Sequence, residues 1–223
     1  MSKRVLVIAA HPDDELLGCG GVIALHAKNG DDLTSVIVCE GDSLRYDDIS
    51  KTHQNQIFEA AKVLGVNDVR SLKFPDQKLE TIVLTDLIEP LLDIIREVKP
   101  QIVYCQYGGD VNRDHKILFE AILVATRPTE LFIETVYAFD TVSSTEWGYP
   151  RSFIPDTWID ISSTLDIKLE AMSKYETELR EFPHPRSLDA LKYKAIASGN
   201  QCLMKSAECF MTIRKTIRDG KLY

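Results

Sequence analysis

The sequence lacks the features that mark several classes of protein. No apolar run approaches the roughly 20 residues that a membrane-spanning helix needs, so we expect no transmembrane segment. The five cysteines are odd in number and form no Cys-x-x-Cys pair, which argues against a disulfide framework and a cysteine-based zinc site. A net charge of −8 means there is no excess of basic residues, so sequence-independent binding of nucleic acid is not expected.

The remaining composition is that of an ordinary globular protein. Hydrophobic residues make up 44% and charged residues 27% of the 223 residues, which argues against disorder and against a coiled coil. Without an internal repeat, a low-complexity stretch or a linker, this length predicts one domain over residues 1–223. The apolar stretch Val5–Ala10 is too short for the core of a signal peptide, and we therefore expect a cytoplasmic protein.

Short β-branched runs alternate with helical patterns along the first part of the chain. The predicted strands are Arg4–Ala10, Leu33–Cys39, Val69–Phe74, Gln101–Cys105 and Thr135–Phe139. The predicted helices between them are Glu15–Lys28, Ile49–Leu64, Thr81–Val98 and Asp114–Ala125. This alternation predicts a three-layer α/β fold with a doubly wound, mainly parallel, Rossmann-like sheet.

The pattern weakens after Thr141. A polar loop precedes Thr157–Ile161, and helical periodicity then covers Leu165–Glu181 and Leu188–Ser198. The apolar pattern of Gln201–Lys221 is ambiguous. We therefore expect a C-terminal extension of helices and loops.

Two clusters of polar residues follow predicted strands. The segment His11–Glu15 comes directly after the first strand, and Asp110–His115 lies in the loop after the fourth. Ligands of open parallel α/β sheets bind beyond the carboxyl ends of the strands, so the two clusters are expected to share one site. Helix capping by Asp13 or Asp14 is the alternative explanation for the first cluster. The placement of both clusters after strands favours a site.

The residue types in these clusters suit a hydrolytic metal centre. Zinc in such a site has three nitrogen or oxygen ligands and a water, and His11, Asp14 and His115 would supply the three. The metal lowers the pKa of the water to about 7 and polarises the carbonyl under attack. Asp13 adjoins Asp14 and is the candidate general base. The expected cofactor is zinc or another divalent transition metal.

Several motifs of the chain are shared with a known enzyme family. They are AHPDDE at Ala10–Glu15, the glycines at 20 and 21, Phe74-Pro75-Asp76 and Asp114-His115. With these motifs the sequence resembles the PIG-L or LmbE-like zinc deacetylases, most firmly over residues 4–125. The resemblance implies removal of an N-acetyl group from an amino sugar, as part of a GlcNAc-type glycoconjugate or a sugar nucleotide. It assigns the same metal ligands and the same general base.

Further roles are expected in the second cluster. Asp114 would orient a histidine or the substrate from beside the last ligand, and Asp110 is a candidate for binding the substrate. Many members of the family carry a histidine three residues before the last ligand, where this chain has Asn112. The amide of Asn112 could act in catalysis by donating to the oxyanion, or it could only shape its loop.

Two arginines are candidates for binding the substrate. Relatives often have an arginine and a glutamate on the second helix, where this chain has His53 and Gln56, so Arg45 is expected to replace that arginine. Arg186 lies in a proline-containing loop and could hold a phosphate or carboxylate through two hydrogen bonds. The alternative for Arg186 is an ordinary surface arginine.

Two other functions fit part of the pattern. A metal-dependent amidase acting on a non-sugar amide would use the same chemistry, whereas a non-catalytic sugar- or nucleotide-binding relative would not need the complete set of polar residues. A Rossmann dehydrogenase is not expected, because HPDDELLGCGG replaces GxGxxG after the first strand. The expected partner is a small amino-sugar substrate, and the sequence leaves open whether the chain forms a homo-oligomer.

Overall fold

The computed structural model describes residues 2–41 and 50–218. Within these residues the strands are β1 (Arg4–Ala9), β2 (Asp32–Cys39), β3 (Asp68–Phe74), β4 (Ile102–Gln106), β5 (Thr135–Phe139), β6 (Thr157–Asp160) and β7 (Ala207–Lys215). The helices are α1 (Asp14–Lys28), α2 (Ser50–Leu64), α3 (Leu84–Val98), α4 (Arg113–Ala125), α5 (Leu165–Met172) and α6 (Leu188–Asn200), with short 3₁₀ helices at Leu79–Thr81 and Thr145–Trp147.

All the strands of the described chain form one sheet, in the order β3-β2-β1-β4-β5-β7-β6. The strands β1 to β5 are parallel, and β7 is antiparallel to both β5 and β6. The chain moves outward from β1 in one direction through β2 and β3, and then returns to β4 on the other side of β1. The strand order therefore reverses between β1 and β4, which is where open α/β sheets bind ligands.

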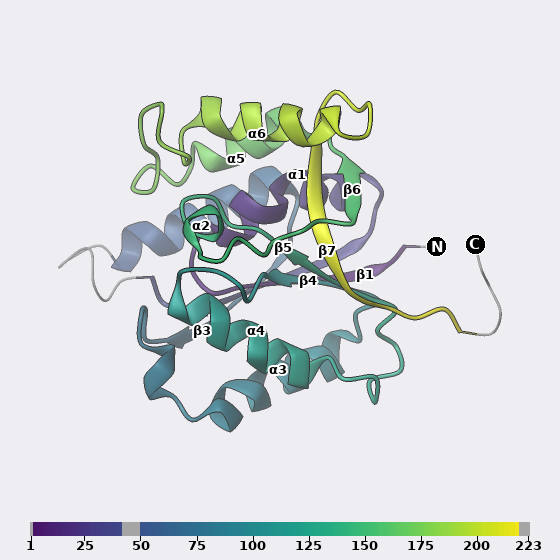
Figure 1. The fold of residues 1–223 in the computed structure, drawn as a ribbon. Helices are drawn as coiled ribbons and strands as arrows, with labels where there is room; N and C mark the ends of the chain where they lie inside the picture. Colours follow the sequence, from purple (N-terminus) through teal and green to yellow (C-terminus); the bar gives the residue numbers. More distant parts are fainter. Residues whose placement is uncertain (1, 42–49, 219–223) are drawn as a thin grey trace.

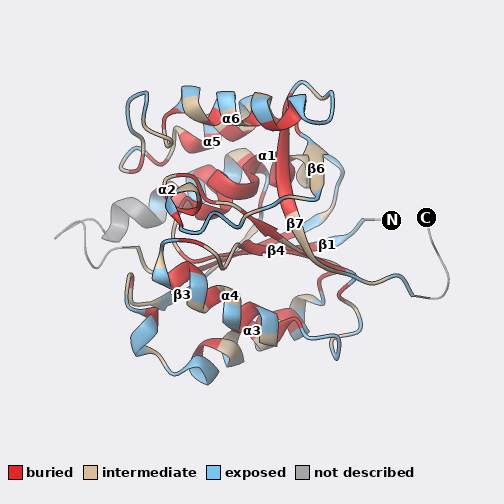
Figure 2. Cartoon of the chain, viewed as in Figure 1, coloured by how far each residue is buried: buried red, intermediate tan, exposed pale blue. Residues whose placement is uncertain are grey.

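Helices cover both faces of the sheet and make the fold three-layered (Figure 1). The helices α1, α2, α5 and α6 lie on one face, and α3 and α4 lie on the other. Along β1, Val5 and Val7 belong to the core on the α1 face, whereas Leu6 and Ile8 belong to the core on the α3 face. Figure 2 shows the resulting burial of the central strands and of the helix sides that face them. The predicted three-layer, mainly parallel fold is confirmed.

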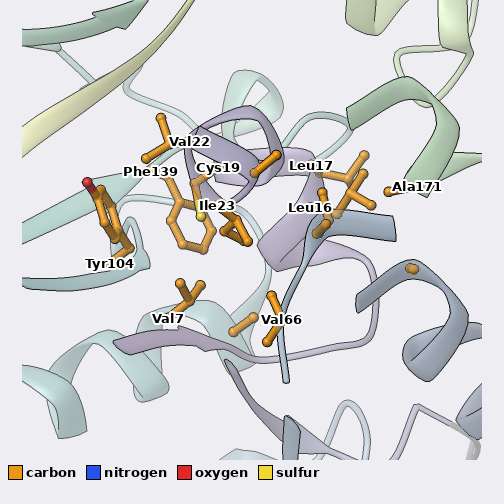
Figure 3. Close-up of a cluster of buried hydrophobic side chains, with 14 of the residues drawn as sticks. Val7, Leu16, Leu17, Cys19, Val22, Ile23, Val66, Tyr104, Phe139 and Ala171 are labelled. Atoms are coloured by element: carbon orange, nitrogen blue, oxygen red, sulfur yellow. The ribbon is translucent and has the colours of Figure 1, made fainter. Parts of the chain in front are cut away.

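The helix α1 lies close to the sheet and to the segment after β6. Figure 3 shows its apolar side chains together with Val7, Tyr104 and Phe139 from the strands below it. A Cβ atom at Gly18 would come 2.0 Å from the ring of Phe139, and one at Gly21 would come 2.7 Å from Ile161. Only glycine at these two positions lets the backbone of α1 come this close to Phe139 and Ile161. These contacts determine the position of α1, which begins with Asp14.

A buried ion pair supports α1 where the helix is broken. Cys19 has non-helical angles (φ −141°, ψ 23°) inside α1. The carboxylate of Glu208 accepts hydrogen bonds from the backbone N–H groups of Gly21 (3.0 Å) and Val22 (2.8 Å), which start the second half of the helix. Lys168 pairs with Glu208 at 2.6 Å. Residues of α5 and β7 therefore act as the cap of a helix far away in sequence.

The C-terminal part differs from the prediction in two elements. The helix predicted over Leu165–Glu181 ends at Met172, and turns follow it. Tyr175 is buried there, and its hydroxyl donates to Glu15 at 2.9 Å, so a tertiary contact outweighs the helical periodicity. The ambiguous tail forms β7, which is paired on both of its edges. No helix of the described chain has the length and apolar character to span a membrane.

Candidate metal centre and active site

Three loops meet at the carboxyl ends of β1, β3 and β4. They carry His11–Asp14, Asp76-Gln77 and Asp110–His115, respectively. A cavity, here called the inner cavity, is lined by His11, Pro12, Asp13, Gly41, Gln56, Asp76, Gln77, Tyr175, Thr177, Glu178 and Arg186. The two clusters that the sequence singles out thus lie together beside this cavity.

Three potential ligand atoms lie close together beside the inner cavity. The distance from His11 Nδ1 to Asp14 Oδ2 is 3.1 Å, and His115 Nε2 lies 3.3 Å from each of these two atoms. A tetrahedral zinc with bonds of about 2.0–2.1 Å has ligand atoms about 3.3 Å apart. The three side chains therefore have the spacing and the atom types of three zinc ligands, and the residues present fit the metal that the sequence predicts.

A carboxylate lies behind each of the two histidines. His11 Nε2 is 3.1 Å from Asp114 Oδ2 and 3.0 Å from Asp76 Oδ1, while His115 Nδ1 is 3.2 Å from Asp110 Oδ2. Such carboxylates fix the tautomer and the orientation of ligating histidines. They leave His11 Nδ1 and His115 Nε2 facing each other and Asp14.

The charges around the three atoms favour a cation. Burial alone would lower the pKa of His11, but hydrogen bonds with Asp114, Asp14 and Asp76 raise it well above its usual value. Burial also opposes protonation of His115, yet Asp14 and Asp110 raise its pKa to about 8. The carboxylates therefore supply a negative potential that a proton or a metal ion can neutralise.

The backbone directs Asp13 and Asp14 to different partners. Asp13 is in the left-handed region (φ 88°, ψ −28°), a conformation that costs a non-glycine residue about 1–2 kcal/mol. Asp14 turns toward the histidines, and its Oδ2 also accepts the backbone N–H of His11 (2.9 Å). Asp13 instead lines the inner cavity, where its Oδ2 accepts from Arg186 Nη1 at 3.0 Å.

Asp13 has an environment suited to accepting a proton. Burial raises the pKa of its carboxyl group well above the usual value, and Arg186 offsets only part of this effect. The neighbouring carboxylates of Asp14 and Glu178 raise the pKa further. A carboxylate with a raised pKa is a stronger base at neutral pH than an exposed aspartate.

Comparison with known proteins identifies the family. The family model described as "PIG-L: GlcNAc-PI de-N-acetylase" matches residues 6–126, which is more than half of the chain. The chain belongs to the PIG-L family. The resemblance carried by the AHPDDE and Asp-His motifs is thereby confirmed, and the motifs lie in the two loops that build the candidate metal centre.

The similar proteins include deacetylases. The chain is 31% identical to the uncharacterized deacetylase YaiS of Escherichia coli K12 over 181 residues, which cover 78% of this chain and 91% of that protein. It is 26% identical to the diacetylchitobiose deacetylase of Thermococcus kodakarensis over 192 residues, which cover 80% of this chain and 71% of the relative.

A solved structure with the same fold is not named as a deacetylase. GalB, the 4-carboxy-2-hydroxymuconate hydratase of Pseudomonas putida KT2440, matches with a TM-score of 0.77 at 23% identity, covering 96% of this chain and 98% of GalB. At this identity the likeness concerns the fold alone. The reaction of this PIG-L protein must therefore be argued from the residues of its site.

Asp110 lies behind His115 and away from the inner cavity. Its carboxylate accepts hydrogen bonds from the hydroxyls of Ser144 and Thr145 and from the backbone N–H of Asn112 (2.8 Å). Burial would raise the pKa of Asp110, but its bonds with His115 and the hydroxyls hold it below the usual range. Both oxygens of Asp110 thus accept hydrogen bonds from protein groups, and the direct substrate contact expected of it stays a prediction.

Asn112 caps the helix that carries His115. Its Oδ1 accepts from the backbone N–H of Asp114 (2.9 Å), and its Nδ2 donates to Gln77 Oε1 (3.3 Å). These contacts are those of a residue that shapes its loop, which is one of the two roles considered for Asn112. The catalytic role of its amide stays a prediction. Arg45, which is also predicted to bind the substrate, lies outside the described residues.

The inner cavity contains residues to which sequence reasoning assigned no role. Asp76 and Gln77 follow β3, so the rule applied to β1 and β4 would have found them. Tyr175 and Glu178 lie in the turns after α5, where the sequence predicts a continuing helix. No local pattern marks these two residues, because long-range packing brings them to the cavity.

Proposed function

We propose that this chain is a metal-dependent deacetylase that hydrolyses the N-acetyl group of an N-acetylated amino sugar. The observation that carries the proposal is the triangle of His11 Nδ1, Asp14 Oδ2 and His115 Nε2 beside the inner cavity. Membership of the PIG-L family and the deacetylase relatives support the same reaction.

The roles of the residues follow from their positions. His11, Asp14 and His115 would hold zinc or a similar divalent metal, and Asp110 and Asp114 would keep the two histidines oriented. The metal, when bound, would supply a Lewis acid that polarises the acetamide carbonyl and lowers the pKa of water. The chain's own groups then have to move one proton and orient the substrate.

Asp13 is the group in place to move the proton. Its carboxylate would take a proton from the attacking water and deliver it to the nitrogen of the leaving amine as the carbon–nitrogen bond breaks. The hydrogen bond from Arg186 Nη1 (3.0 Å) holds the carboxylate in one orientation. In this proposal Arg186 positions the base as well as bordering the substrate cavity, and Arg45 is retained as a substrate ligand.

The test is a substrate panel with acetate release as the measured quantity. Zinc-loaded protein is incubated with nucleotide-, lipid- and thiol-linked N-acetylhexosamines and with simple N-alkylacetamides. We expect acetate from one class of amino-sugar conjugate and none from the alkylacetamides. Release from the alkylacetamides alone would favour the non-sugar amidase, and no acetate from any compound would contradict the proposed reaction.

A further inference from the structure

A second cavity adjoins the inner cavity and shares Arg186 with it. This outer cavity is lined by Ser143, Trp147, Arg180, His184 and Arg186. The inner cavity has Asp13, Asp76 and Glu178 in its lining, whereas the outer cavity has no carboxylate. The two neighbouring cavities therefore differ in charge, although the chain as a whole carries a net charge of −8.

Arg180 gives the outer cavity a fixed positive charge. Its Nη1 donates to the backbone carbonyls of Thr177 (2.8 Å) and Leu179 (2.7 Å), which anchors one end of the guanidinium. Among the described residues no carboxylate lies within ion-pair distance of Arg180. No described residue therefore pairs with the remaining N–H groups of Arg180, and they can donate to a ligand. The planar guanidinium matches carboxylate and phosphate groups.

His184 adds a neutral donor to the same lining. Its Nδ1 accepts the backbone N–H of Arg186 at 3.1 Å, so the proton of the neutral ring is on Nε2. Burial, together with Arg186 and Arg180, lowers the pKa of His184. Glu146 opposes this shift, but its carboxylate accepts the backbone N–H groups of the loop before it. The two arginines add to the effect of burial on this pKa, and their positive charge favours an anion beside His184.

Trp147 forms an aromatic wall of the outer cavity. The residue is 57% exposed, and its ring stands at 88° to the ring of His184, with centroids 6.5 Å apart. Every side chain of the lining can donate a hydrogen bond: one hydroxyl, one indole, one imidazole and two guanidinium groups. Such a lining suits a ligand that offers acceptors and negative charge.

We propose that the outer cavity binds an anionic group, a carboxylate or a phosphate, on the aglycone of the N-acetylated amino sugar. The inference rests on the proposed deacetylase function, because it takes the acetamide to occupy the inner cavity. Arg180 and His184 contact the anion, and Trp147 covers the apolar part of the aglycone. The substrate class is therefore an N-acetylaminosugar with an acidic aglycone.

The test compares three glycosides of one N-acetylated amino sugar. Their aglycones have the same size and end in a carboxylate, a phosphate or a neutral carboxamide. For the zinc-loaded protein we expect a KM about tenfold lower for at least one charged glycoside than for the carboxamide, the range of one hydrogen bond to a charged group. Arg180→Gln should abolish this ratio, and Arg151→Gln, an exposed arginine outside both cavities, should retain it.

Calorimetric titration of the deacetylated products gives a readout that does not depend on turnover. The charged products should bind zinc-loaded protein about tenfold more tightly than the carboxamide product, and Arg180→Lys should keep part of this preference. Acetate release without any charge preference, or a preference that survives Arg180→Gln, would overturn the outer-cavity inference alone. A charge preference in product binding without acetate release would contradict the proposed function instead.

Discussion

At the scale of single residues, the neighbouring aspartates Asp13 and Asp14 contact different partners because the backbone turns between them. Asp14 faces the two histidines, while the left-handed conformation of Asp13 directs its carboxylate to Arg186 and the inner cavity. Asp13 therefore lies next to the proposed metal ligands but is not a member of the group His11, Asp14 and His115. In the proposed function, Asp13 transfers the proton and Asp14 binds the metal.

Replacement of Asp13 tests this separation. We expect Asp13→Asn to lower kcat by about 10²–10⁴-fold, because a general base contributes about that factor, while the metal content stays at the wild-type level. Turnover and elemental analysis of the same preparation check both parts. Wild-type turnover in Asp13→Asn would assign the proton transfer to another group, and loss of metal would make Asp13 part of the metal site.

Asn112 allows the cap and the amide donor to be tested apart. Asn112→Ala removes the bond to the N–H of Asp114 and should destabilise the fold by about 1 kcal/mol, the usual worth of an N-cap. Asn112→Asp keeps an acceptor there but loses the Nδ2 donor, so it should unfold near the wild-type temperature. Thermal unfolding of both variants checks this expectation. Equal destabilisation by both would refute the capping role, and lower turnover in a stable Asn112→Asp would support the catalytic one.

At the scale of elements, α1 depends on residues far from it in sequence. Glu208 of β7 accepts the N–H groups that follow the break at Cys19, and Lys168 of α5 neutralises its charge. Both charged side chains are buried. Because α1 begins with Asp14, this ion pair also supports the candidate metal centre.

Removal of the buried carboxylate should therefore destabilise the fold strongly. We expect Glu208→Ala to lower the free energy of unfolding by about 3–5 kcal/mol, because Lys168 is left as an unpaired buried charge. The matched control is Glu97→Ala, which removes the partner of Arg70 from a solvent-exposed pair and should change the free energy of unfolding only slightly, because water screens exposed pairs. Urea unfolding of the two variants measures the difference. A cost for Glu208→Ala as small as that of the control would show that the ion pair does not support α1.

The elements also show which parts of the structure the sequence can predict. The strands β1 to β5 and the loops after β1 and β4 follow from short apolar runs and the polar residues at their ends, and both signals are local. The end of α5 and the strand β7 could not be predicted, because contacts such as Tyr175 with Glu15 join residues far apart in sequence. The same reason explains why Glu178 was missed in the inner cavity, although the polar clusters after β1 and β4 were singled out.

At the scale of the whole molecule, the site lies where the strand order reverses. The proposed metal ligands come from the loops after β1 and β4, which are adjacent strands but far apart in sequence. A metal held by both loops would join them in the folded state only. We propose that residues 1–223 act as one domain around this shared sheet.

Metal removal should consequently lower the thermal stability of the whole domain. A ligand present at about 100 times its Kd stabilises the folded state by about 2.7 kcal/mol, so chelation should lower Tm and added zinc should restore it. Differential scanning calorimetry of native, chelated and reloaded protein measures the shift. The shift should vanish in His115→Ala, and a shift that persists in that variant would place the stabilising metal elsewhere.

The metal content of the protein and its histidine variants tests the central claim most directly. Elemental analysis of zinc-loaded, dialysed protein should find one ion per chain in the wild type. His11→Ala and His115→Ala should each retain almost none, because each removes one corner of the ligand triangle. The matched control is His26→Ala, which removes a histidine paired with Asp31 away from the site and should keep the ion. One ion per chain in all the variants would contradict the assignment of His11, Asp14 and His115 as the metal centre.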